Sequence, residues 1–250
     1  MSKRDIVSGR ELKEKTGYND YSLEAVKYMK SREKGFFRVD KMYFSGGAMH
    51  GSLNDHKVQD YYGTSSYNSF AQINFVKYMR GYDVIDKYSE YASRWVDGLR
   101  NRPFLEPLNH VKYVLTKNAS INPLWKNTHD SVAKFGDVVV LKHKFELPIG
   151  YTYEAFMPRS EFDRLSPTQK DLMSYKAVII EDEDLQKTGA LKRIGLNDSI
   201  DFRTFTWDYL PNKIQDLKQE SLQLSVFEQD RIEGKIKLSK EKLAYFSFPY

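Results

Sequence analysis

The stretch Asp137-Val138-Val139-Val140-Leu141 decides the fold class of this chain of 250 residues. Its continuous apolar run is typical of a buried β-strand. Two similar runs, Lys112-Tyr113-Val114-Leu115 and Ala177-Val178-Ile179-Ile180, lie before and after it in the sequence. A fourth strand is predicted near the N-terminus, at 36–43. These runs predict that buried sheet forms a large part of the core.

Helices are predicted between the strands. Asp20 can cap a helix that carries Leu23, Val26 and Met29 at helical spacing. Ser166-Pro167-Thr168-Gln169 is a second helix start, because serine caps, proline suits the first helical position and glutamine can reach back to the cap amide. Further helices are expected at about 70–79, 89–99 and 103–110.

The pattern changes after about residue 200. Leu222, Leu224 and Val226 alternate with polar residues, and this period of two is typical of half-buried antiparallel sheet. We therefore predict an α+β fold. In it, a mixed α/β domain at 1–200 is followed by a β-rich segment at 201–250, which packs on the first part and forms an incomplete sandwich.

Composition excludes several classes of protein. Hydrophobic residues make up 40% of the chain, which is too much for a disordered protein, and there is no cysteine. The 39 Lys and Arg residues against 34 Asp and Glu residues give a net charge of +5. These charges alternate in sign instead of forming a basic stripe, so we expect no nucleic-acid partner.

Neither end of the chain resembles a targeting segment. Met1-Ser2-Lys3-Arg4-Asp5 has no apolar stretch behind it, so it is not a secretory signal peptide. The last residues, 243–250, form an apolar run without a polar tail, which favours a piece excised from a longer chain. No window approaches the ~18 apolar residues of a membrane helix.

A loop-like region from Ser45 to Ser69 is the feature that most favours a binding function. Tyrosine rings can lie against the apolar faces of a sugar, while amides and carboxylates bind its hydroxyl groups. The alternative is that these tyrosines cover an edge of the core. The residues concerned are Tyr61, Tyr62 and Tyr67, beside Asn54, Asp55, Ser65, Asn68 and Asn74.

Motifs of the common catalytic classes are absent from the sequence. The five histidines form no HExxH pair, the glycines form no phosphate-binding loop, and no GxSxG elbow is present. We therefore expect no metal site and no cofactor.

Several short motifs, in this order, resemble the YfhO family of large bacterial membrane proteins. Each is weak alone, but their order and spacing match the family over most of the chain. They are 17–25, 36–39, Asn54-Asp55, 62–69 with Asn74, Arg102-Pro103, 111–115, 147–153 and 246–250.

This resemblance implies a polytopic glycosyltransferase of the GT-C type, which takes a sugar from a polyprenyl-phosphate carrier. The acceptor would be a cell-wall polymer such as lipoteichoic acid, and the lack of cysteine agrees with a Gram-positive surface protein. The chain would then be an extracytoplasmic domain that recognises or positions the acceptor. Its membrane helices and catalytic residue would lie outside this sequence, so we predict no catalytic residue here. The substrate-binding residues we predict are Asn54, Asp55, Tyr62, Tyr67, Asn74 and Arg102.

Two other functions remain open at this stage. The chain could be a structural or protein-interaction module of a membrane protein that binds no glycan, and such a module would expose an apolar patch. It could also be a free-standing carbohydrate hydrolase, which would need two carboxylates facing each other across a cleft.

Overall fold

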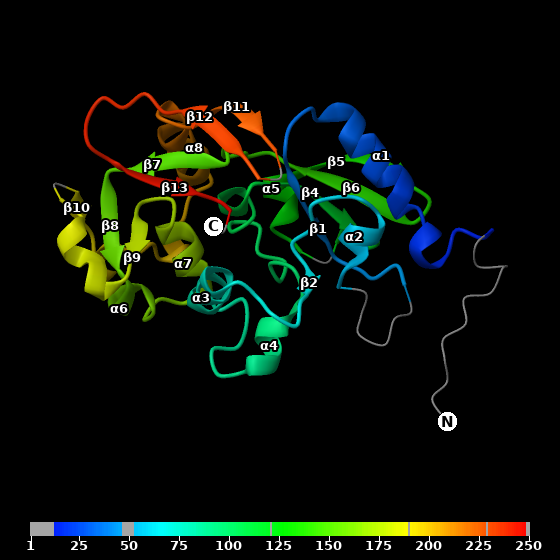
Figure 1. The fold of residues 1–250 in the computed structure, drawn as a ribbon, viewed down its shortest axis with the longest axis horizontal. Coiled ribbons are helices and arrows are strands. Elements are labelled where there is room, and N and C mark those ends of the chain that lie inside the picture. The colour runs from blue at the N-terminus through cyan, green and yellow to red at the C-terminus, as the bar shows by residue number, and fades with distance from the viewer. Residues whose placement is uncertain (1–12, 47–52, 121, 190, 229, 249–250) are drawn as a thin grey trace. The chain divides into compact units, whose positions relative to one another are not determined.

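The computed structural model describes residues 13–46, 53–120, 122–189, 191–228 and 230–248 (Figure 1). The first five residues and the last two of the C-terminal run lie outside the described part. Spatial contacts divide the chain into two compact units. Unit 1 is formed by Met1–Ala71, Tyr88–Pro103 and Val111–Lys144, and unit 2 by Gln72–Lys87, Phe104–His110 and Phe145–Tyr250. The predicted boundary at residue 200 falls inside unit 2, and the domain division at that point stays a prediction.

Unit 1 is built on a mixed four-stranded sheet of order β1-β4-β6-β5. β1 pairs parallel with β4, whereas the other two pairings are antiparallel. The strands of unit 1 are β1 (Arg38–Lys41), β2 (Ser66–Tyr67), β3 (Trp95–Val96), β4 (Val111–Thr116), β5 (His129–Phe135) and β6 (Val138–His143). Its helices are η1 (Gly17–Asn19), α1 (Ser22–Arg32), α2 (Asp55–Val58), α4 (Glu90–Arg94) and α5 (Trp125–Thr128).

The apolar run at 138–141 lies in the centre of this sheet. β6 lies between β4 and β5, and Val138 and Val140 are completely buried. α1 packs across the same sheet, as Figure 1 shows, and places Ala25 and Met29 in the core cluster with them. Burial of one such side chain contributes about 1.5–3 kcal/mol. The predicted strands at 112–115 and 137–141 and the first helix are therefore confirmed.

The helix predicted at 89–99 is shorter in the structure. α4 ends at Arg94, and the next two residues form β3, which pairs with β2. Gly98, Arg100 and Asn101 then have φ angles of 56°, 55° and 58°. This left-handed backbone cannot continue a right-handed helix. Local periodicity thus predicted the start of the helix and missed its end.

In the described part of unit 2, the strands form three small sheets. β8 pairs parallel with β9 and β10, β11 pairs antiparallel with β12, and β13 pairs antiparallel with β7. Its strands are β7 (Gly150–Tyr153), β8 (Ala155–Pro158), β9 (Val178–Ile180), β10 (Lys192–Arg193), β11 (Gln223–Phe227), β12 (Ile232–Lys235) and β13 (Leu243–Phe246). Its helices are α3 (Ile73–Gly81), η2 (Pro107–Asn109), α6 (Arg159–Phe162), α7 (Pro167–Met173), η3 (Asp182–Lys187), η4 (Leu196–Asp198), η5 (Phe202–Thr204) and α8 (Tyr209–Gln219).

The start of α7 confirms the predicted cap. Ser166 accepts a hydrogen bond from the backbone of Gln169, whose side chain bonds the Ser166 amide in return. The helix predicted at 103–110 is the short 3₁₀ turn η2. α8 was not predicted and lies within the part expected to be β-rich. Its buried residues, Leu210, Ile214 and Leu217, have helical spacing.

The chain is therefore an α+β protein, as the sequence predicts. Antiparallel pairing after residue 200 is confirmed by the two-stranded sheets β11-β12 and β13-β7. Among the described residues, none of the helices combines the length and the apolar character that crossing a bilayer requires.

Candidate functional site

An aromatic stack lies where the two-stranded sheet of unit 1 meets α4. Tyr67 on β2 is the register partner of Trp95 on β3, and their ring centroids are 4.1 Å apart with 30° between the planes. Tyr91 on α4 stacks on Trp95 at 5.3 Å and 21°. These three residues form one row of rings, which we call the aromatic stack.

Local sequence explains why the rings meet. Tyr91 and Trp95 are four residues apart, and this spacing places side chains on one face of a helical turn. Ser89 caps α4 by accepting a hydrogen bond of 3.1 Å from the Ala92 amide. Across the sheet, the amide of Asn68 donates to the carbonyl of Arg94 at 3.1 Å.

Asn54 fixes the backbone of Tyr67 through two hydrogen bonds. Its Nδ2 donates to the carbonyl of Tyr67 at 3.2 Å, and the amide of Tyr67 donates to its Oδ1 at 3.1 Å. The side-chain amide of Asn54 thus bonds both backbone groups of Tyr67, in the way that the backbone of a neighbouring strand does. Two of the predicted site residues, Asn54 and Tyr67, are therefore in direct contact.

The outer rings of the stack are open to solvent. Tyr91 is 65% exposed and Tyr67 is 36% exposed, while Trp95 is half-buried between them. A ring held in place by its neighbours loses little conformational freedom when a ligand covers it. The stack can therefore bind a flat, partly apolar ligand such as a sugar ring.

Asp55, next to Asn54, has a different environment. Its carboxylate is 2% exposed, and its Oδ2 accepts from Lys41 Nζ at 2.5 Å and from the Ser45 amide at 2.9 Å. Gln59 Oε1 accepts from the same ammonium at 3.2 Å. Asp55 thus lies in a buried polar network, where it fixes the fold of the loop.

The buried polar network extends to the start of α1. Asp20 is 3% exposed and accepts from Ser45 Oγ at 2.7 Å and from the Ser22 amide at 2.9 Å. Burial alone would raise the pKa of Asp20, but the hydrogen bonds from Ser22 and Ser45 lower it. Burial lowers the pKa of Lys41, while the hydrogen bond and charge of Asp55 oppose that shift. We use the term buried network for Asp20, Lys41, Ser45, Asp55 and Gln59.

The remaining predicted site residues lie outside the aromatic stack. Tyr62 is 60% exposed, and its ring packs on Phe36 at a centroid distance of 4.8 Å. Arg102 is half-buried in unit 1, and Asn74 is an exposed residue of α3 in unit 2. The role of all six residues in binding stays a prediction.

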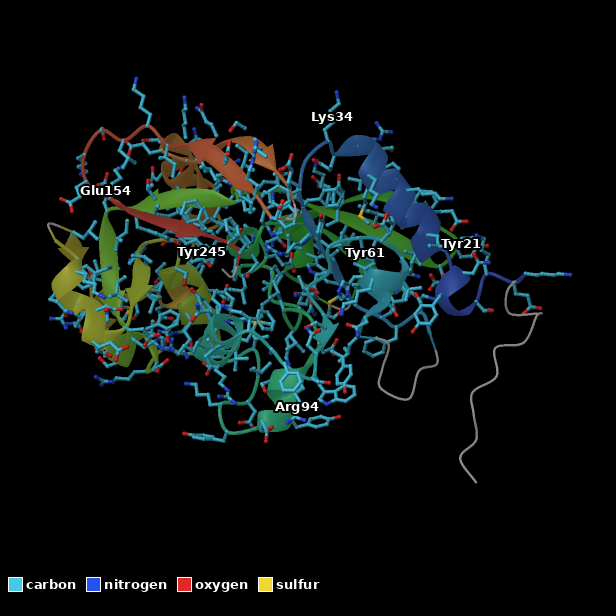
Figure 2. The ribbon with its side chains drawn as sticks, in the orientation of Figure 1. Tyr21, Lys34, Tyr61, Arg94, Glu154 and Tyr245 are labelled. Atoms are coloured by element: carbon cyan, nitrogen blue, oxygen red, sulfur yellow. The ribbon has the colours of Figure 1, made fainter. Side chains whose placement is uncertain are left out.

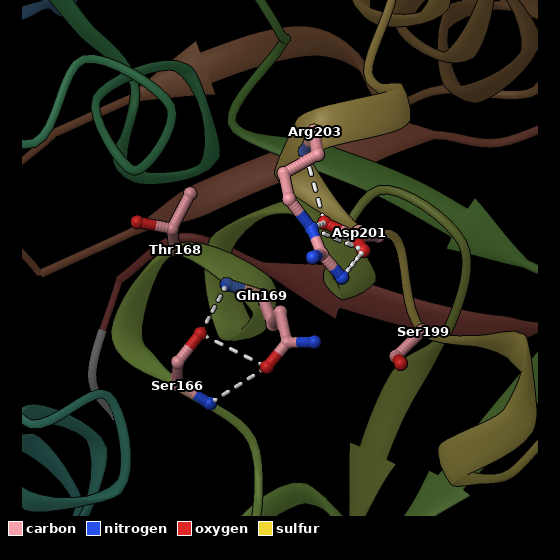
Figure 3. Close-up of a pocket in the computed structure, with 6 residues that line it drawn as sticks. All are labelled: Ser166, Thr168, Gln169, Ser199, Asp201 and Arg203. Carbon is pink, nitrogen blue, oxygen red and sulfur yellow. Dashed lines mark hydrogen bonds and ion pairs between the residues drawn. The ribbon is translucent and has the colours of Figure 1, made fainter.

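A hollow on unit 2 is lined by polar residues, but these residues bind one another (Figure 3). Ser166 and Gln169 form the capping box of α7, and Arg203 donates through Nε to Oδ1 and through Nη2 to Oδ2 of Asp201. The hydrogen bonds from Arg203 lower the pKa of Asp201 to about 2. None of the residues that line the hollow is aromatic, so for a sugar it is a weaker candidate than the stack. The other residues drawn in the hollow are Thr168 and Ser199.

Tyr91 and Trp95 were not predicted as site residues. Helical periodicity placed Trp95 within a longer helix, and the pairing of β3 with β2 has no local signal. The four-residue spacing of the two aromatic residues could have indicated that their rings meet.

Comparison with known protein families gave a match over most of the chain. The family model described as "Bacterial membrane protein YfhO" matches residues 1–207. This span includes the aromatic stack, the buried network and the whole of unit 1. No curated protein and no solved structure matches the chain.

Proposed function

Since the chain belongs to the YfhO family of bacterial membrane proteins, we propose that it is a water-exposed domain that positions a glycan acceptor for its parent protein. The parent would be a membrane glycosyltransferase that uses a polyprenyl-linked sugar. Its acceptor would be a cell-wall polymer of the lipoteichoic acid type, on the extracytoplasmic side. The catalytic residue would lie outside this chain.

The aromatic stack is the observation that carries the proposal. Tyr91 presents an exposed ring that is supported from behind by Trp95. Rings of this kind can cover the apolar face of a pyranose, and an aromatic contact contributes about 0.5–1.5 kcal/mol beyond area burial. One such contact suits weak, repeated binding along a polymer, because several sugar units can occupy the site in turn.

The polar groups beside the stack support the same ligand class. Asn54 has a half-buried amide next to Tyr67, and Arg94 and Glu90 form an exposed ion pair on α4. Hydroxyl groups of a sugar can bond to such groups without requiring a net charge at the site. The negatively charged phosphates of teichoic acid would also be attracted to the chain, which has a net charge of +5.

The test is a titration of the chain with fragments of lipoteichoic acid, followed by two-dimensional NMR. The three tryptophan indole signals are assigned from single Trp→Phe variants. We expect the Trp95 indole and the amides of Tyr67 and Tyr91 to shift. Tyr91→Ala should weaken binding about fivefold, because one ring contact of about 1 kcal/mol is removed.

Tyr18→Ala is the matched control, since Tyr18 is also an exposed tyrosine of unit 1, at 38%. It should leave the affinity unchanged. If the Trp95 signal does not move, or if both variants bind alike, the stack does not bind glycan.

A further inference from the structure

Tyr62 belongs to a second exposed aromatic site of unit 1. Its ring is 60% exposed and packs on Phe36 at a centroid distance of 4.8 Å. The guanidinium group of Arg38 lies over the same Phe36 ring, with Cζ 4.9 Å from the ring centroid. We call Tyr62, Phe36 and Arg38 the Tyr62 platform. It differs from the aromatic stack in that one of its three members is a cation.

The local backbone explains why these three side chains meet. Burial alternates along 36–39, as expected of an extended chain whose successive side chains point to opposite faces. Phe36 and Arg38 therefore share the outer face, while Phe37 belongs to the core cluster. The amide of Val39 donates to the carbonyl of Tyr62 at 2.8 Å. This bond fixes the backbone of Tyr62 against β1.

Basic side chains are concentrated in the segment that leads into the platform. Residues 30–38 hold four of them and one acidic residue, Glu33. The carboxylate of Glu33 accepts hydrogen bonds from three side chains of β4 and β6, and Lys30 pairs with Asp60 at 2.5 Å. Figure 2 labels Lys34, which extends into solvent just after α1. The surface beside the platform is therefore positively charged. The basic residues are Lys30, Arg32, Lys34 and Arg38.

This combination of groups suits a phosphate that is attached to a sugar or a polyol. A guanidinium group keeps its charge at any physiological pH, and its planar fork of N–H donors matches the oxygens of a phosphate. An arginine that stacks on a ring can still donate these bonds from the edge of its plane. The exposed ring of Tyr62 can cover the apolar face of the attached unit. A neutral sugar would make no use of the charge.

The Tyr62 platform and the aromatic stack are carried by one short segment of unit 1. Tyr62 and Tyr67 are five residues apart, so their Cα atoms are at most about 18 Å from each other. Both ends of the segment are tied to strands, since Gly63 bridges to β1 and Ser66 pairs with β3. A short oligomer can therefore contact both sites at once.

We infer that the Tyr62 platform is a second subsite for the acceptor polymer and binds one of its phosphate groups, while the aromatic stack binds a neutral sugar unit. This subsite rests on the proposed function, because it takes the same polymer. It adds a residue for specificity: Arg38 distinguishes a polymer linked by phosphodiesters from a neutral glycan.

The test compares two matched probes in NMR titrations of the whole 250-residue chain. One probe is a lipoteichoic acid fragment, and the other is the neutral glycoside left when its phosphate groups are removed. Arg38→Gln should weaken binding of the phosphorylated fragment about tenfold, because a charged hydrogen-bond donor is lost, and should leave binding of the neutral glycoside unchanged. Tyr91→Ala should weaken binding of both probes.

Two further variants separate the role of the guanidinium group from loss of charge or of fold. Arg38→Lys keeps the charge without the planar fork, so it should recover only part of the affinity. Tyr62→Ala removes an exposed ring and should weaken binding of the phosphorylated fragment about threefold to fivefold. Lys126→Gln is the control, since Lys126 is an exposed cation of α5, which leads into the opposite edge strand β5. It should leave the affinity unchanged, and thermal unfolding checks that each variant is folded.

The signals distinguish failure of this subsite from failure of the proposed function. If the Trp95 indole shifts and Arg38→Gln binds the phosphorylated fragment as the wild type does, the subsite is wrong and glycan binding at the stack stands. If the Trp95 indole shifts with neither probe, the proposed function fails. Vesicles of phosphatidylglycerol, at equal phosphate concentration, give the remaining comparison. Tighter binding to these vesicles, lost in Arg38→Gln, would assign the platform to a lipid headgroup and overturn the inference.

Discussion

Asn54 and Asp55 are neighbours in the sequence, but they belong to two different regions. In one of these regions charged groups are buried, and in the other aromatic rings are exposed. Asp55 leads into the buried network, where two carboxylates and an ammonium group are almost without solvent contact. Asn54 supports the aromatic stack, where tyrosine rings face water. Buried charges need partners to offset their lost hydration, and exposed rings gain from a ligand. The first region therefore stabilises the fold, and the second is the region for which we propose ligand binding.

The largest effect is expected in the buried network. Lys41→Ala would leave Asp55 buried without its ammonium partner and would remove a favourable charge near Asp20, at a loss of about 3–5 kcal/mol in the free energy of unfolding. Chemical denaturation measures this loss directly. Lys30→Ala is the control, because Lys30 pairs with Asp60 at an exposed site, with side-chain exposures of 45% and 94%. Its effect should stay below about 1 kcal/mol. Similar losses for the two variants would remove the distinction between the buried network and the surface.

A second ion cluster is more exposed than the buried network and less exposed than the Lys30–Asp60 pair. It tests whether the loss in the free energy of unfolding depends on burial. Glu33 follows α1, with 14% of its side chain exposed. Its carboxylate accepts from Lys112 at 3.0 Å, and from Tyr113 and Lys142 at 2.9 Å each. Burial alone would raise the pKa of Glu33, but these three hydrogen bonds lower it to about 2. The cluster therefore joins the end of α1 to β4 and β6.

This low pKa gives a defined pH dependence. The unfolded-state pKa is near 4.5, so the contribution of Glu33 is fully present above that pH and is lost as pH falls towards 2. At pH 7 the free energy of unfolding of the wild type should exceed that of Glu33→Gln by about 2–3 kcal/mol. This difference in free energy should become smaller between pH 5 and pH 3. Urea denaturation of both proteins across this range measures it. A difference that does not change with pH would mean that the carboxylate charge is not responsible.

The contrast between the two regions also explains what the sequence could predict. Apolar runs such as 137–141 predicted strands correctly, because a run of this kind is stable only when buried. The capping box at Ser166 was equally local. By contrast, the environment of Asp55 depends on Lys41, which is fourteen residues away. No local pattern links these two residues.

The candidate site shows the same limit. Tyr67 and Asn54 were selected as possible ligands of a sugar, and their mutual hydrogen bonds were not foreseen. Trp95 joins them through a strand pairing about thirty residues apart. The pairing of β3 with β2 also ended a helix that periodicity would have continued. Tertiary pairing, and not residue type, brought the rings of the stack together.

The smallest effect is expected at Asn54, where the two regions adjoin. Asn54→Ala removes two hydrogen bonds to the backbone of Tyr67 at a partly exposed site, so the free energy of unfolding should fall by about 1 kcal/mol. The Tyr67–Trp95 contact should loosen, and the near-ultraviolet circular dichroism of the aromatic rings should weaken. Asn68→Ala is the control, since Asn68 is exposed and contributes its backbone amide to the sheet. If Asn54→Ala instead lowers the free energy of unfolding by several kcal/mol, Asn54 stabilises the fold as the buried network does. It would then have to be counted with the buried network and not with the aromatic stack.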